Sequence, residues 1–109
     1  MSETNVDACC RVVDALPAEI PAEGRRMEAL IKTPSLDLRR LLLAKGGELP
    51  THTAPGEITV HCLEGRVDFI AGGKTNDLRA GQLIHLGAGI PHSVVGTEPS
   101  VVLITRIGG

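Results

Sequence analysis

From residue 26 onward, hydrophobic and polar positions alternate in short runs separated by glycine and proline. A period of two is typical of β-strands with one buried face. The run from Leu36 to Leu43 begins with strict alternation and becomes fully apolar, which predicts a strand whose second half is covered on both faces. The expected strands are 26–32, 36–43, 51–54, 57–63, 66–71, 74–78, 83–86, 92–95 and 101–107. Eight or more short strands with glycine-rich turns favour an all-β sandwich or barrel.

Residues 1–25 lack this alternation. The apolar positions from Val6 to Leu16 are compatible with one short helix or turn, which would end before Pro17. Pro17 and Pro21 prevent the following stretch from being helical throughout. We therefore expect an N-terminal extension, residues 1–25, and a single β-barrel domain, residues 26–109, because a chain of 109 residues has room for one core.

The composition narrows the candidate functions. With one Phe and no Trp or Tyr, the core must consist of Leu, Ile, Val and Ala, and there are no rings for base stacking or a cation cage. A formal charge of −2 without a basic cluster argues against a nucleic-acid partner. The adjacent Arg39 and Arg40 are expected to point to opposite faces of a strand and to be solvated. Three cysteines without C-x-x-C spacing, no signal peptide and short apolar runs predict a cytoplasmic protein without a membrane partner.

The candidate chemistry lies in two glycine-bounded pieces, residues 46–65 and 81–92, which contain all four histidines. Two turn-bounded strands that carry histidine, separated by a hairpin, indicate a small barrel with a polar pocket at its mouth. His61 lies three residues after Ile58, so simple alternation places it on the opposite face of its strand from Ile58. The facing of His85 stays open. The four candidates are His52, His61, His85 and His92.

Several short segments give the chain a resemblance to the cupin superfamily of jelly-roll barrels. They are Leu63-Glu64-Gly65, Ala80-Gly81 and Gly89-Ile90-Pro91-His92-Ser93. Cupins carry two motifs, and in the family two His and one Glu of the first motif bind a divalent metal together with the His of the second. The resemblance covers about the last two thirds of the chain and implies a small single-domain cupin of the conserved-barrel type.

The two motifs match this chain in part. Of the first motif, Gly46, His52 and Gly65 are present, while Ala54 stands at its second His and Ile58 at its Glu. Of the second motif, the matching residues are Gly81, Gly89 and His92, while its Pro falls on Gly87 and its Asn on Gly96. The architectural glycines are therefore intact, and two of the four metal ligands are replaced.

The resemblance implies a pocket lined by His52 and His92, in which a weakly held Fe, Ni, Cu or Zn would need a third ligand from His61, His85 or Glu57. Cys62 shares strand parity with Ile58 and is a further pocket candidate, or a small buried hydrophobe. The leading hypothesis is a homodimeric cupin that binds a small polar molecule. Under this hypothesis the protein could be an oxygenase or an isomerase. The alternatives are a metal-free ligand-sensing module, in which the histidines still offer acid–base chemistry, and a purely structural dimer.

Overall fold

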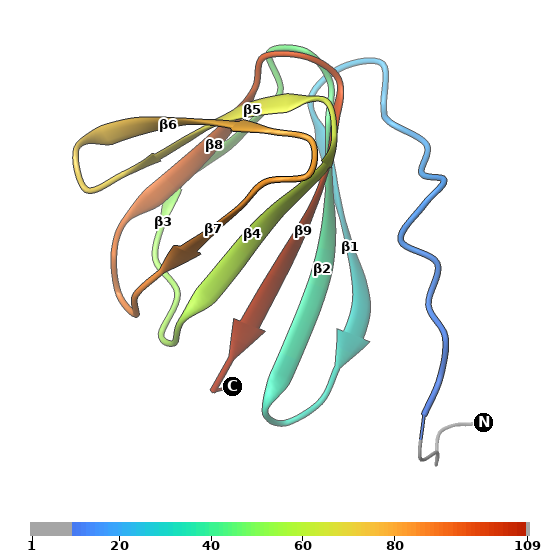
Figure 1. Cartoon of the computed structure of the whole chain (residues 1–109), viewed down its shortest axis with the longest axis vertical. Helices are drawn as coiled ribbons and strands as arrows, with labels where there is room; N and C mark the ends of the chain where they lie inside the picture. The colour runs from blue at the N-terminus through green and yellow to red at the C-terminus, as the bar shows by residue number, and fades with distance from the viewer. Residues whose placement is uncertain (1–9, 109) are drawn as a thin grey trace.

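The computed structural model describes residues 10–108, which form an all-β fold of nine antiparallel strands without a helix (Figure 1). The strands are β1 (Arg25–Lys32), β2 (Leu36–Leu43), β3 (Glu48–His52), β4 (Ile58–Glu64), β5 (Arg66–Ala71), β6 (Lys74–Arg79), β7 (Leu83–Leu86), β8 (His92–Gly96) and β9 (Ser100–Ile107). The expected strands 36–43, 66–71 and 83–86 are matched at both ends. No helix in the described part of the chain is long and apolar enough to cross a membrane.

The strands form two facing sheets with the crossed connections of a jelly roll. One sheet has the order β1-β2-β9-β4-β7, and the other has the order β3-β8-β5-β6. The starts of β2, β4 and β8 and the ends of β3, β7 and β9 gather at one end of the molecule, the lower end in Figure 1. We call this end the mouth of the barrel. The jelly-roll architecture expected from the resemblance is confirmed.

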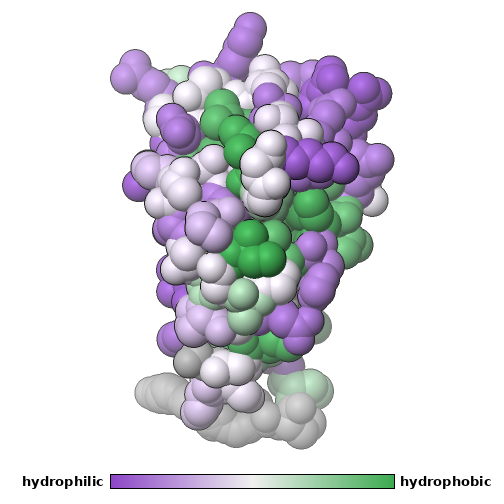
Figure 2. Space-filling view, turned by 90° about the vertical axis from the view of Figure 1, so that its left-hand side faces the viewer, coloured by the Kyte–Doolittle hydropathy of each residue, from purple (hydrophilic) through white to green (hydrophobic). Residues whose placement is uncertain are grey.

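The core lies between the two sheets and follows the alternation of the strands. On β4, Ile58, Val60 and Cys62 are buried, while the residues between them are half-buried on the outer face. The buried cluster consists mainly of Leu, Ile and Val, as the composition requires, with Phe69 as its single aromatic side chain. On the face shown in Figure 2, hydrophobic side chains reach the surface in a narrow strip between polar ones.

The apolar end of β2 is covered on both faces, as the sequence predicted. Leu41 and Leu43 face the core, and Leu42, on the outer face, is only 1% exposed. Arg40, also on the outer face, donates hydrogen bonds to the backbone oxygens of Asp14 (3.2 Å) and Ala15 (2.9 Å). The N-terminal segment therefore lies along this face, so the apolar run does not itself require a second copy of the chain. The homodimer stays a prediction.

Two expected elements differ from the structure. Residues 10–16 have no regular secondary structure, whereas a short helix or turn was expected over 6–16, of which residues 6–9 lie outside the described chain. The backbone oxygens of this segment bond to Arg40 of the sheet instead of to one another. The third strand is Glu48–His52 instead of 51–54. It contains Pro50, which an edge strand tolerates because its missing N–H can face solvent, and its register shifts between Leu49 and His52.

Candidate functional site

His52 and His92 meet at the mouth of the barrel. His52 ends β3 and His92 begins β8, and the two residues are directly opposite each other in the ladder between these strands. Their ring centroids lie 4.2 Å apart with an angle of 60° between the ring planes. The fold thus brings together two side chains that are forty positions apart in the sequence.

Each of the two imidazoles is oriented by its own backbone. Nδ1 of His52 lies 2.9 Å from the oxygen of Pro50, and Nδ1 of His92 lies 2.9 Å from the oxygen of Ile90. A carbonyl oxygen can only accept a hydrogen bond, so Nδ1 is the protonated nitrogen in both rings. In the neutral rings, Nε2 then carries the lone pair, and it can accept a hydrogen bond or a proton from a bound molecule.

The two rings differ in their surroundings. His92 is 3% exposed and stacks on Phe69, with centroids 5.6 Å apart, while His52 is exposed. Burial lowers the pKa of His92, the bond to Ile90 opposes this shift, and the charges of His52 and Arg106 lower the pKa further. His92 is therefore a neutral imidazole near pH 7, suited to accept a hydrogen bond.

The other two metal-ligand positions of the family motif are apolar here. Ala54 and Ile58 are both buried in the core cluster. Within residues 10–108, no group of three or more His, Cys, Asp or Glu side chains gathers to hold a metal ion. A catalytic metal usually needs three protein ligands, and the mouth offers two nitrogens. The donor set therefore does not fit a tightly held metal.

His61 and His85 lie on the outer face of the five-stranded sheet. His61 is opposite Leu83 and Leu103, on the face away from the core, as simple alternation predicted. His85 is exposed, and its Nε2 lies 2.6 Å from Oε1 of the exposed Glu57. The structure does not bring either histidine, or Glu57, to the pair at the mouth. A hollow of about 210 Å³ lies beside His85 on this outer side, away from the mouth histidines.

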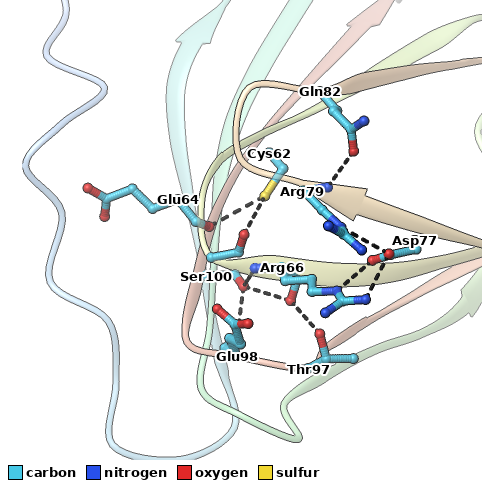
Figure 3. A network of polar contacts seen from close by, with 10 residues as sticks. Cys62, Glu64, Arg66, Asp77, Arg79, Gln82, Thr97, Glu98 and Ser100 are labelled. Atoms are coloured by element: carbon cyan, nitrogen blue, oxygen red, sulfur yellow. Dashed lines mark hydrogen bonds and ion pairs between the residues drawn. The ribbon is translucent and has the colours of Figure 1, made fainter.

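Cys62 faces inward but lies near the other end of the barrel. Its side chain is fully buried, and Sγ is directed at the backbone oxygens of Glu64 (3.4 Å) and Gly65 (3.7 Å) (Figure 3). Burial raises the pKa of the Cys62 thiol. The structure thus places this residue within the core and does not bring it to His52 and His92.

Sequence reasoning missed Arg106, which lies at the mouth. Arg106 is directly opposite Ile58 on one side and Asp37 on the other. Directly opposite residues share a face of the sheet, so Arg106 is on the same inner face as the buried Ile58. The parity of β9 could have revealed it, because Arg106 follows Val102 and Ile104 at intervals of two.

Asp37 is a buried carboxylate surrounded by cations. Its side chain accepts hydrogen bonds from Nε and Nη2 of Arg39 (2.9 and 3.0 Å) and from Nζ of Lys32 (3.3 Å). Arg39 and Arg40 do point to opposite faces, but the expectation that both are solvated is wrong, because Arg39 pairs with Asp37 and Arg40 with Glu28. The bond to Arg39 is the main cause that lowers the pKa of Asp37.

The buried ion pair predicts a loss of stability in acid. Because the pKa of Asp37 lies below its ordinary value of 3.8 in the folded chain, its stabilising effect is complete above pH 3.8 and is lost as the pH falls through the folded pKa. We expect Asp37→Asn to lower the free energy of unfolding by about 1.5–3 kcal/mol at pH 6. Urea unfolding should show a smaller difference from wild type at pH 3. Asp77→Asn, which removes an exposed partner of Arg66, should change little at either pH.

The fold and these positions define a small jelly-roll barrel with an apolar interior and a polar mouth. The chain belongs to the cupin-domain family, whose sequence model matches residues 39–106. Similar solved structures include an RmlC-like cupin from Desulfovibrio desulfuricans, with 21% identity and a TM-score of 0.80 over 90% of this chain and 97% of that one. A cupin 2 conserved barrel domain protein from Leptotrichia buccalis has 28% identity and a TM-score of 0.79 over 84% and 44%.

Two further proteins are similar to this chain. A putative mannose-6-phosphate isomerase from Ralstonia eutropha has 20% identity and a TM-score of 0.77, covering 92% of this chain and all of that one. Human integrin beta-4 is 36% identical in an alignment of 64 residues, which covers 52% of this chain and 4% of that protein's length.

Proposed function

We propose that this cupin-domain protein binds a small polar molecule at the mouth of its barrel, through Nε2 of His52 and Nε2 of His92, without the help of a metal. The observation that carries the proposal is the pair of imidazoles, 4.2 Å apart, whose Nδ1 atoms are both engaged by backbone oxygens. Small-molecule sites typically combine apolar walls with a few placed polar groups. Here the buried Ala54 and Ile58 supply apolar surface where the family motif has metal ligands.

A weakly held divalent metal at His52 and His92 is the second candidate. The bonds from Nδ1 to Pro50 and Ile90 favour it, because histidines that bind metals usually donate their other ring N–H in this way. If a metal were bound, it would act as a Lewis acid towards an oxygen of the ligand. The first candidate is stronger, because the described residues offer only these two ligands at the mouth and the positive charge of Arg106 acts on His92.

Thermal unfolding in the presence of small sugars, polyols and organic acids tests the proposal. A ligand at 100 times its Kd should stabilise the wild type by about 2.7 kcal/mol and raise its Tm accordingly. His52→Ala, which alters an exposed side chain, and His92→Gln should each abolish the rise. His85→Ala, on the outer face, should retain it.

Elemental analysis of protein purified without chelator separates the two candidates. Substoichiometric metal in a protein that responds to ligand agrees with the metal-free site. Stoichiometric metal that is lost in His52→Ala would replace it with the second candidate. No response to any molecule of the panel, in a folded protein, would refute ligand binding at the mouth.

A further inference from the structure

The mouth of the barrel carries an arginine whose donor groups are largely unused. The side chain of Arg106 has one polar contact among the described residues, an approach of Nη1 to Oδ2 of Asp37 at 3.9 Å. This distance is too long for a hydrogen bond. A guanidinium has five N–H donors in a planar fork that matches a carboxylate, and here the side chain is 35% exposed, so a molecule from solvent can reach it.

The buried carboxylate nearby does not satisfy Arg106. Asp37 already accepts two hydrogen bonds from Arg39 and one from Lys32. Three cations thus surround one carboxylate, which leaves an excess of positive charge at this point of the mouth. A hollow of about 20 Å³, large enough for a water molecule, lies against Arg106, Asp37 and Lys32.

The positive charge of Arg106 lies at the same end of the barrel as the two histidines of the mouth. It is directly opposite Ile58, the residue that stands where the family motif has its metal-binding carboxylate. Arg106, near the end of β9, and His92, at the start of β8, lie at the same end of the barrel, and the charge of Arg106 contributes to the lowered pKa of His92. The family motif would place a negative metal ligand here. This chain instead places a positive side chain near two imidazole rings.

We infer that the ligand of the mouth is a small organic acid whose carboxylate pairs with Arg106 while its hydroxyl or second polar group bonds to Nε2 of His52 or His92. This inference rests on the proposed function, since it assigns the chemical class of the same ligand. Bidentate pairing of a guanidinium with a carboxylate gives both affinity and orientation. Asp37 is already paired with Arg39 of the same strand, which leaves the Arg106 fork for the ligand.

Calorimetric titration of the full chain at fixed ionic strength tests the inference. The probes are glycolate, lactate and malate, their neutral amides, and inorganic phosphate. We expect the acids to bind at least tenfold more tightly than the amides, and Arg106→Gln to weaken binding of the acids about ten- to a hundredfold. Arg79→Gln is the matched control, because it removes the same charge from an exposed surface ion pair with Asp77. It should keep wild-type affinity.

The possible outcomes distinguish a failure of this inference from a failure of the proposed function. Amides that bind as tightly as the acids, in a manner lost in His52→Ala, would overturn the inference and leave the proposed function standing. Acids that bind Arg106→Gln as tightly as wild type, or phosphate as the only anion bound, would also overturn it. If neither acids, amides nor the neutral polar molecules of the thermal panel bind, the proposed function itself fails. Circular dichroism of each variant verifies that the strands are formed.

Discussion

Replacing Phe69 with alanine is expected to lower the free energy of unfolding by about 3–5 kcal/mol. Phe69 is the only Phe of a chain without Trp or Tyr, and it is fully buried in the centre of β5. The aliphatic side chains around it cannot fill the space of a missing ring without moving two sheets. A loss of this size is a large part of the stability of a small domain, so urea unfolding should show a much lower midpoint with a similar slope.

The same substitution also removes the support of the site, because Phe69 stacks on His92. Phe69→Leu is the control: it keeps most of the apolar volume and should cost less than half as much, although it also removes the ring contact. If Phe69→Ala costs under about 1 kcal/mol, the centre of the barrel must collapse around the gap, and the packing described for this core is incorrect.

The fold could be predicted from the sequence because most of it depends on local patterns. Alternation on β4 and β9 and the glycine-bounded turns define strands whose inner faces are apolar, and this information lies within each segment. The start of β3 could not be predicted, since Leu49 and Pro50 look like a loop in isolation. This segment becomes a strand only because Glu48, Leu49 and His52 pair with β8, from a distant part of the chain.

The residues of the candidate site could be predicted where they belong to the family motif, and not elsewhere. His52 and His92 were indicated by their spacing from motif glycines, and alternation gave the facing of His61. Alternation on β9 could have placed Arg106 on the inner face, but its position beside Ile58 and Asp37 depends on the register of β9 against β4 and β2. Register between strands far apart in sequence is a tertiary property, so no local pattern shows that Arg106 faces Ile58.

The two ends of the barrel interior differ in their polar contacts. At the far end, Cys62 and its neighbours are closed off by backbone contacts, with the side chain of Ser100 accepting a hydrogen bond from the backbone N–H of Arg66 at 3.0 Å (Figure 3). At the mouth, polar groups keep unused donors and acceptors on Arg106, His52 and His92. A rigid closed end and an open polar end agree with the proposed binding site at the mouth.

Gly65→Ala is expected to be the most damaging glycine substitution at the closed end. Gly65 joins β4 to β5 with φ at +83°, a conformation that costs an L-residue about 1–2 kcal/mol. A Cβ there would also lie 2.2 Å from the backbone oxygen of Pro99 and 2.4 Å from Oγ of Ser100. Forcing these groups apart adds about 1–3 kcal/mol, because the first neighbour is backbone that cannot rotate away.

Gly81→Ala separates the cost of a positive φ from the cost of the steric clash. Gly81 has a φ of +90°, but a Cβ there would meet nothing within 4 Å, so only the backbone cost of about 1–2 kcal/mol is expected. Urea unfolding should rank wild type above Gly81→Ala, and Gly81→Ala clearly above Gly65→Ala, which is expected to accumulate partly as insoluble chain. Equal stability of the two variants would mean that β9 can move away from the β4–β5 turn at no cost. In that case the contacts of Ser100 with Arg66 could not be what closes this end of the barrel.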